Sequence, residues 1–192
     1  EKTVDEVTEK LTVVTHEISR LKKMVSSMLI LSRSDQNRMR VEKENFSVTS
    51  LINEIIEPFT MMAEIDEKVM HVALDNDARI YSDPDLVKQC IIVLLDNALK
   101  YTQKGQSVSL FLVDRDNKVE IIVSDTGPGV KEEELKKIFD RFYRTDESRS
   151  ASTGGSGLGL SIVQTIVKTL DGRVYAEHNK PHGLKVVLEF PK

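Results

Sequence analysis

The sequence has one cysteine, no tryptophan and no long apolar run in its 192 residues. A single thiol excludes a disulfide framework, and no segment has the run of about 20 apolar residues that a membrane-spanning helix needs. A signal-peptide pattern is also absent, and the net charge of −4 gives no sign of a nucleic-acid or membrane-surface binder. Cys90 stands in an apolar helical run, so we expect a buried, inert thiol, with a reactive thiol as the alternative.

The first 33 residues contain neither glycine nor proline. Apolar residues recur there at alternating spacings of three and four, which is typical of a helix in a bundle or coiled coil. We call these positions the seam: Val4, Val7, Leu11, Val14, Ile18, Leu21, Val25 and Met28. A helix cannot bury such a seam alone, so we expect a partner helix from a missing part of the protein or from a second copy. Because the chain opens at Glu1 without an initiator Met, we also expect a fragment of a longer, membrane-anchored protein.

Beyond a polar linker over 36–45, the apolar pattern predicts interspersed helices and strands. We expect helices over 51–59, 86–101, 131–139 and 158–170, and strands over 46–48, 69–74, 80–81, 107–113, 119–124, 173–177 and 184–190. Thr49 or Ser50 is expected to cap the first of these helices, and Ser82-Asp83-Pro84 to begin the second. Since the strands come largely in hairpins, we predict a two-layer α/β sandwich with one helix layer on one mostly antiparallel sheet.

The stretch Gly154-Gly155-Ser156-Gly157-Leu158-Gly159-Leu160 carries four glycines in six residues and runs directly into an apolar helical pattern. Glycine lets the backbone approach a ligand closely, and the first N–H groups of a helix carry partial positive charge. Together they favour a phosphate site, although the stretch alone fits a flexible linker equally well. Residues 145–156 are polar and lack an apolar anchor, so we expect a mobile lid.

Two further residues suit a ligand that bears phosphates. Asn97 stands on a predicted helix, and its neutral oxygen suits a hard cation such as Mg²⁺. Asp125 ends a predicted strand, and the glycine turn after it leaves room for a flat ring whose amino group can donate to the carboxylate. Each feature also has a structural explanation, as a helix-packing amide or as turn formation. Chance is nevertheless a poor explanation for all three features in this order.

Four ordered motifs resemble those of one known family. Leu94-Leu95-Asp96-Asn97-Ala98-Leu99-Lys100-Tyr101-Thr102 resembles the N box of sensor histidine kinases, and Asp125-Thr126-Gly127-Pro128-Gly129-Val130 resembles their G1 box. Ile138-Phe139-Asp140-Arg141-Phe142-Tyr143-Arg144 is similar to the F box, and the 154–160 stretch to the G2 box. The order and spacing resemble the ATP-binding catalytic domain of that family, in the GHKL superfamily. The resemblance implies a Bergerat-type ATP-binding fold over residues 41–192.

The resemblance also implies roles for single residues. Asn97 would ligate Mg²⁺, Lys100 would lie near the phosphates, Asp125 would receive the adenine amino group, and Arg144 would reach toward the γ-phosphate. Of these, Asn97, Lys100 and Arg144 are the implied catalytic residues. The implied nucleotide-binding set is Asn97, Lys100, Tyr101, Asp125, Gly127, Gly129, Arg144, Gly155, Gly157, Leu158 and Gly159.

Val93 distinguishes between reaction types within the superfamily. Members that hydrolyse ATP carry a glutamate four residues before the Asn97 position, where it activates water; valine cannot act as a base. The resemblance therefore implies transfer of the γ-phosphate of Mg-ATP to a histidine on a dimerisation hairpin, and from there to a response regulator. We expect a cytoplasmic fragment that binds no nucleic acid and makes no direct membrane contact. The alternatives are a nucleotide-binding GHKL module that acts through protein contacts, or a GHKL ATPase.

The N-terminal helix fits the same family. Residues 18–33 resemble the second helix of the dimerisation hairpin, so we assign residues 1–40 to that helix and a linker, and expect a homodimer through it. In the family the first hairpin helix carries the phosphorylated histidine, and we expect that helix to be absent from this sequence. Thr15-His16-Glu17-Ile18 resembles the acceptor motif superficially, but no proline follows and the seam is unbroken. We therefore expect His16 to be a surface histidine.

Overall fold

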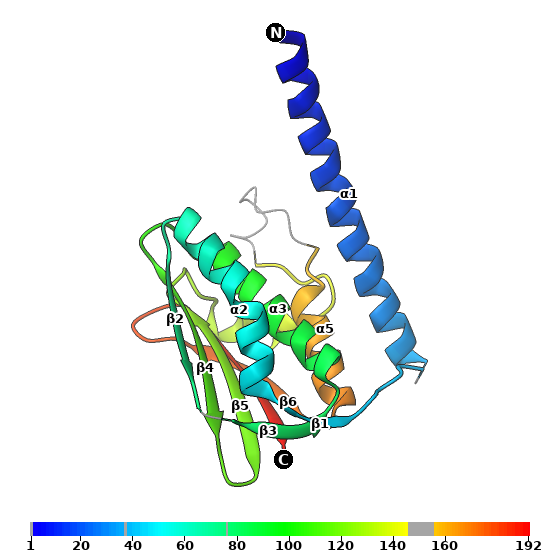
Figure 1. Ribbon diagram of the computed structural model, residues 1–192, viewed down its shortest axis with the longest axis vertical. Helices are drawn as coiled ribbons and strands as arrows, with labels where there is room; N and C mark the ends of the chain where they lie inside the picture. The colour runs from blue at the N-terminus through cyan, green and yellow to red at the C-terminus, as the bar shows by residue number, and fades with distance from the viewer. Residues whose placement is uncertain (1, 37, 76, 146–155) are drawn as a thin grey trace. The chain divides into compact units, whose positions relative to one another are not determined.

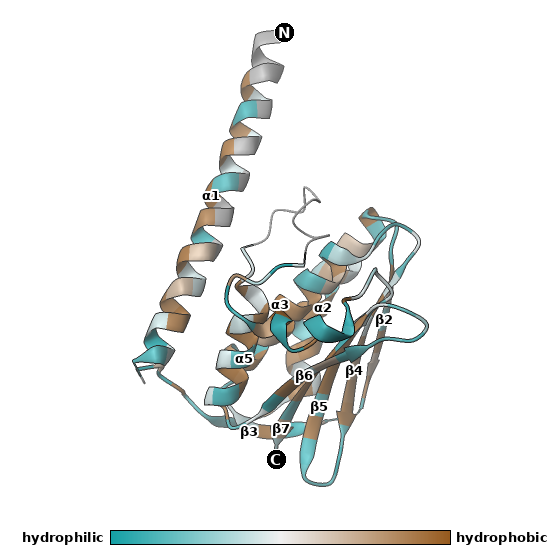
Figure 2. Ribbon diagram, turned by 180° about the vertical axis from the view of Figure 1, so that it is seen from behind, coloured by the Kyte–Doolittle hydropathy of each residue, from teal (hydrophilic) through white to brown (hydrophobic). Residues whose placement is uncertain are grey.

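The computed structural model describes residues 2–36, 38–75, 77–145 and 156–192, and the chain forms two compact units, Glu1–Met39 and Arg40–Lys192. The first unit is a single helix, α1, Lys2–Asp35, as the sequence predicts. Hydrophobic and hydrophilic segments follow one another along its described residues (Figure 2). Most described seam residues expose between 52% and 60% of their surface, namely Val7, Leu11, Val14, Ile18, Leu21 and Val25.

In the described part of the second unit, three α-helices pack on one face of a five-stranded sheet (Figure 1). The helices are α2 Val48–Ile65, α3 Pro84–Tyr101 and α5 Gly159–Thr169. The strands are β2 Val69–Leu74, β4 Ser107–Asp114, β5 Lys118–Asp125, β6 Arg173–His178 and β7 Leu184–Pro191, in the order β2-β4-β5-β7-β6. Only β2 and β4 pair in parallel among the described strands, so the predicted two-layer, mostly antiparallel sandwich is confirmed.

A separate antiparallel ribbon of β1, Glu44–Ser47, and β3, Arg79–Ser82, lies outside the main sheet. The sequence predicts a strand over 46–48, but the strand ends at Ser47 and Val48 already belongs to α2. Val48 is completely buried, and burial of its apolar side chain in the core favours its place in the helix.

The core lies between the sheet and the helices. Alternate residues of the central strands face the helices and are almost fully buried, because side chains of a strand alternate between its two faces. These residues are Val108, Leu110 and Leu112 of β4 and Val119, Ile121 and Val123 of β5. Cys90 of α3 is buried with them, so the expected burial of this thiol is confirmed, and burial raises the pKa of the thiol.

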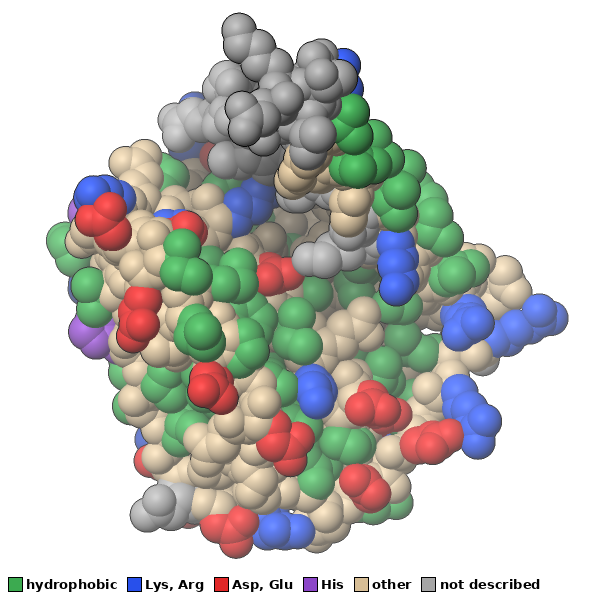
Figure 3. All heavy atoms as spheres, turned by 45° about the horizontal axis from the view of Figure 1, so that its top comes forward, with side chains coloured by type: hydrophobic (Ala, Val, Ile, Leu, Met, Phe, Trp, Pro, Cys, Tyr) green, Lys and Arg blue, Asp and Glu red, His purple; other side chains and the backbone are tan. Residues whose placement is uncertain are grey.

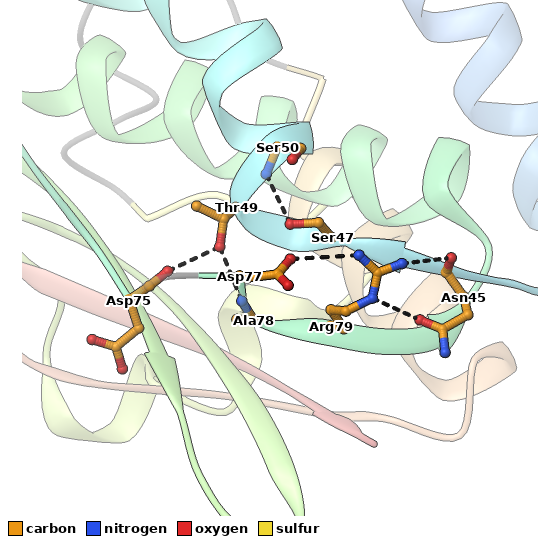
Figure 4. A network of polar contacts seen from close by, with 8 residues as sticks. All are labelled: Asn45, Ser47, Thr49, Ser50, Asp75, Asp77, Ala78 and Arg79. Carbon is orange, nitrogen blue, oxygen red and sulfur yellow. Dashed lines mark hydrogen bonds and ion pairs between the residues drawn. The ribbon is translucent and has the colours of Figure 1, made fainter.

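Helix α2 begins differently from the prediction. Ser47, rather than Thr49 or Ser50, is its N-cap, and its hydroxyl accepts a 3.2 Å hydrogen bond from Ser50 N. The Thr49 hydroxyl instead donates to Asp75 O at 2.9 Å and accepts from Ala78 N at 3.1 Å (Figure 4). Thr49 therefore joins α2 to the turn between β2 and β3, and this tertiary contact decides which hydroxyl caps the helix.

Helix α3 begins as predicted. Asp83 caps it by accepting from Leu86 N at 3.0 Å, and Pro84 is the first helical residue. The other Asp83 oxygen accepts from Glu42 N at 2.8 Å, which fastens the start of the unit to this helix. The same residue thus positions the helix that carries Asn97.

The predicted helix over 131–139 is wrong. The structure has two short 3₁₀ turns there, η1 Glu132–Glu134 and η2 Lys137–Phe139. The buried side chains of this segment, Ile138 and Phe139, are adjacent rather than three or four residues apart. This short segment has no apolar stripe to pack. The free energy of packing is therefore too small to offset the cost of nucleating an α-helix.

Candidate functional site

Asp125 ends β5 as a buried carboxylate with 6% of its surface exposed. Its Oδ1 accepts hydrogen bonds from Gly127 N at 2.9 Å and Leu184 N at 3.3 Å. Burial raises the pKa of Asp125, and the two backbone N–H groups oppose this shift. No described residue donates to Oδ2, so this oxygen is available to an amino group.

The turn after Asp125 packs tightly on the end of α3. Thr126 fastens it to β4, because Thr126 N donates to Ser107 O at 3.0 Å and Ser107 N donates to Thr126 Oγ1 at 2.9 Å. A Cβ on Gly127 would lie 2.6 Å from Tyr101 O, so the close approach requires glycine at this position. The strand end with Asp125 therefore meets the helix end with Tyr101.

One face of α3 carries the candidate residues, because positions three and four apart are neighbours on a helix. Asn97 is followed on this face by Lys100 and Tyr101, and Lys100 Nζ lies 5.1 Å from the centroid of the Tyr101 ring. Val93 precedes Asn97 by one turn. All four side chains are half-buried.

The N-terminus of α5 lies against this face. A Cβ on Gly159 would be 3.4 Å from Asn97 Nδ2 and 3.2 Å from Val93 Cγ1. Leu158, the N-cap residue, is buried and its side chain provides no capping hydrogen bond. The first N–H groups of α5 therefore carry partial positive charge beside Asn97, in an arrangement that suits phosphate.

The F-box segment contacts the glycine stretch through the backbone. Phe142 N donates to Gly157 O at 2.9 Å, and Phe142 has a φ of 64°, which is rare for a bulky residue. Arg144 follows two residues later and is half-buried. The segment 146–155, which begins two residues after Arg144, is not among the described residues. Gly155 and nearly all of the expected lid therefore lie outside them.

The structure thus brings together most of the residues that the sequence singles out. Four elements contribute: the end of α3, the end of β5, the F-box segment and the start of α5. The described members of the set are Asn97, Lys100, Tyr101, Asp125, Gly127, Gly129, Arg144, Gly157, Leu158 and Gly159.

Sequence reasoning missed a fifth contributor, the turn between β6 and β7. Asn179 Nδ2 donates to Asp125 O at 2.7 Å, and His182 Nδ1 donates to Gly127 O at 3.2 Å. The sequence Asn179-Lys180-Pro181-His182-Gly183 marks a turn. Its contacts with the Asp125 segment span more than 50 residues of sequence, and no local pattern reports them.

Charge on the surface is mixed. Figure 3 shows acidic and basic side chains interspersed over the face in view, among the residues that the structure describes. None of the helices in the described part of the chain has the length and apolar character that crossing a bilayer requires.

Comparisons with known proteins identify the family of this chain. The family described as histidine kinase-, DNA gyrase B-, and HSP90-like ATPase matches residues 82–192, which is more than half of the chain. The sensor protein CiaH of Streptococcus pneumoniae serotype 4 is 34% identical over 196 residues, which cover 100% of this chain and 44% of that protein. The chain therefore spans less than half the length of this curated relative.

Two solved structures are similar in fold and sequence. The catalytic domain of histidine kinase ThkA is 30% identical with a TM-score of 0.70, and the match covers 79% of this chain and 98% of that domain. ThkA in complex with the response regulator protein TrrA matches at 28% identity and a TM-score of 0.74, over 94% of this chain and 49% of that one. The chain belongs to the histidine kinase-, DNA gyrase B- and HSP90-like ATPase family, and within it to the sensor histidine kinases.

Proposed function

We propose that residues 41–192 bind Mg-ATP and transfer its γ-phosphate to a histidine on a dimerisation hairpin, from which a response regulator is phosphorylated. The observation that carries the proposal is buried Asp125, whose Oδ2 receives no hydrogen bond from any described residue. It lies at one end of a site whose other end is the N-terminus of α5, where the side chain of the N-cap residue Leu158 provides no capping hydrogen bond. An adenine amino group suits the first, and phosphates suit the second.

The metal part of the proposal rests on the donors present. Among the described residues, no three or more His, Cys, Asp or Glu side chains gather to hold a metal ion. Asn97 offers one neutral oxygen beside the proposed phosphate position, and Mg²⁺ commonly takes one or two protein ligands together with phosphate oxygens and water. Bound Mg²⁺ would neutralise charge that develops on the phosphates during transfer.

The remaining roles follow from position. Lys100 and Tyr101 continue the Asn97 face of α3, so we assign them to the phosphates. Arg144 follows the F-box segment that contacts Gly157, and we assign it to the γ-phosphate. Val93 supports transfer over hydrolysis, because an apolar side chain stands one turn before Asn97 where a water-activating base would act.

The whole protein's partners belong to the same proposal. The complex of ThkA with its response regulator supports a response regulator as partner. The exposed seam of α1 supports homodimerisation through residues 1–40. We place this chain in the cytoplasmic part of a membrane-anchored sensor, without contact to nucleic acid or to the membrane itself.

Calorimetric titration with Mg-ATP tests the site. We expect Asn97→Ala and Asp125→Ala each to weaken binding by at least about tenfold, the range for hydrogen bonds to charged groups. Asn117→Ala, in the exposed β4–β5 turn, is the matched control and should bind as the wild type does. Wild-type affinity in both site variants would contradict the assignment.

Transfer is tested separately, with γ-labelled ATP and the dimerisation hairpin of a related histidine kinase. We expect weak, acid-labile labelling of the hairpin, since the covalent tether that positions the two domains is missing. Nucleotide binding without any labelling would favour a GHKL module that acts through protein contacts.

A further inference from the structure

The turn between β6 and β7 lies where the pairing of β5 with β7 ends. The last paired residues are Ser124 and Lys185, one position before Asp125. Beyond this pair, a side chain holds the backbone of β5: Asn179 Nδ2 donates a 2.7 Å hydrogen bond to Asp125 O. A side chain of the turn thus holds the backbone of the residue that we assign to the adenine amino group.

The orientation of the Asn179 amide is fixed by its own turn. Oδ1 accepts from Lys180 N at 3.0 Å, so the NH₂ group must face Asp125. Asn179 N in turn donates to Gly183 O at 3.0 Å, which closes the turn. The donor that reaches Asp125 is therefore preorganised.

His182 holds the next part of the segment. Its Nδ1 lies 3.2 Å from Gly127 O, and since a carbonyl only accepts, Nδ1 must carry the proton. Gly127 N is one of the two donors to Asp125 Oδ1. A contact that fixes Gly127 therefore also fixes the carboxylate.

Gly183 brings the turn into direct contact with Asp125. Its φ is 113°, and a Cβ there would collide with Asp125 O, so only glycine fits. Leu184, the next residue, supplies the second donor to Asp125 Oδ1 at 3.3 Å. Both donors that occupy Oδ1, and so leave Oδ2 for a ligand, depend on this turn.

We propose that Asn179 and His182 are positioning residues of the base site, which hold Asp125 and Gly127 so that Asp125 Oδ2 faces the amino group of the base. The proposal rests on the proposed function, in which this site binds an adenine nucleotide. It predicts that the turn affects recognition of the amino group specifically. A turn that only stabilises the fold would weaken the binding of every nucleotide alike.

The test compares ATP with inosine triphosphate, which carries an oxygen in place of the amino group. Calorimetry should show that the wild type prefers ATP. We expect Asn179→Ala and His182→Ala each to lower ATP affinity by about three- to tenfold, the value of one hydrogen bond, with inosine triphosphate affinity unchanged within about twofold. The ratio of the two affinities should therefore shrink in both variants.

Lys180→Ala is the matched control, because the Lys180 side chain is exposed in the same turn and its role there is through the backbone. It should keep the wild-type ratio. If Asn179→Ala fails to fold, His182→Ala still tests the proposal, because His182 is exposed and its replacement does not disturb the core. Equal losses for both nucleotides in the two variants would overturn the positioning role while leaving the adenine site intact. A wild type without preference for ATP would instead overturn the adenine assignment, and this proposal with it.

Discussion

The Tyr143 hydroxyl donates a 2.8 Å hydrogen bond to Glu134 Oε1, and so joins the residue before Arg144 to the segment that follows the Asp125 turn. Glu134 Oε2 accepts from Lys131 N at 3.0 Å, so both oxygens of one carboxylate are used. The backbone N–H of Lys131 and, after it, the Tyr143 hydroxyl lower the pKa of Glu134. Glu134 thus connects the two segments that flank η1 and η2.

Removing this bond should slow transfer rather than weaken nucleotide binding. Tyr143→Phe deletes one hydroxyl beside Arg144, the residue that we assign to the γ-phosphate. We expect the transfer rate to fall by about two- to tenfold, as for the loss of one hydrogen bond, while ATP affinity is retained. Single-turnover labelling of a hairpin, together with calorimetry, separates the two quantities. Tyr175→Phe, on β6, is a control of the same chemistry, and an equal effect there would contradict the assignment.

Glu134 also predicts a pH dependence. Its folded-state pKa is lower than the ordinary 4.5, so its contribution to stability is fully present above that value and is lost as pH falls through the folded pKa. The difference in melting temperature between wild type and Glu134→Gln should therefore be largest near pH 7 and shrink below pH 4.5. A difference that is constant from pH 7 to pH 3.5 would contradict this role.

Gly127→Ala should damage both the fold and the site. The added Cβ would lie 2.6 Å from Tyr101 O, so either the turn or the end of α3 must move. We expect a loss of stability of about 1–3 kcal/mol, as for other overpacked sites, and loss of measurable ATP binding. Thermal unfolding and calorimetry measure the two effects. Gly105→Ala separates collision from backbone strain, because Gly105 has a φ of 79° but open space around its Cβ position, whereas Gly127 has no positive φ.

Local patterns account for what the sequence predicted correctly. The alternation of β4 and β5 and the Asp83 cap of α3 depend on neighbours within a few residues, so a linear reading finds them. The N-cap of α2 depends on tertiary structure instead. Thr49 is bound to Asp75 and Ala78, 26 and 29 residues away, which leaves Ser47 to cap the helix.

The candidate site shows the same division. The α3, β5 and α5 contributors carry recognisable motifs, and the structure brings them together. Asn179 and His182 act on Asp125 and Gly127 across 54 and 55 residues, through contacts that exist only in the folded sheet. The turn can be recognised in the sequence, but its contact with the Asp125 segment cannot.

Val93→Glu should shift the reaction toward water. A carboxylate at this position would stand one turn before Asn97, beside the N-terminus of α5 where Gly159 lies. We expect ATP hydrolysis to rise by about a hundredfold, the lower end of what a positioned general base contributes. Val93→Gln has the same size without a base and serves as the control. If the glutamate variant binds ATP but hydrolyses it no faster than the glutamine variant, the idea that Val93 disfavours hydrolysis by removing a base is contradicted.

The seam of α1 should drive self-association. Burying each of its large apolar side chains is worth about 1.5–3 kcal/mol, too much to leave solvated along a rigid helix. Leu21→Glu should weaken association by at least about tenfold, whereas Lys22→Glu, on the neighbouring exposed position, should not. Sedimentation over a range of concentrations measures this. A monomer at every concentration whose α1 amides are nonetheless protected from exchange would contradict the prediction.

His16 should not be phosphorylated in this chain. It falls within α1, which continues without a break from Lys2 to Asp35, so no hairpin turn separates it from the catalytic unit. The family places its acceptor on the first hairpin helix, whereas the sequence around α1 resembles the second. We therefore expect ATP binding without self-phosphorylation when the chain is incubated with γ-labelled ATP. Acid-labile label that appears on the wild type and vanishes in His16→Ala would make His16 the acceptor, and would assign α1 to the first hairpin helix instead.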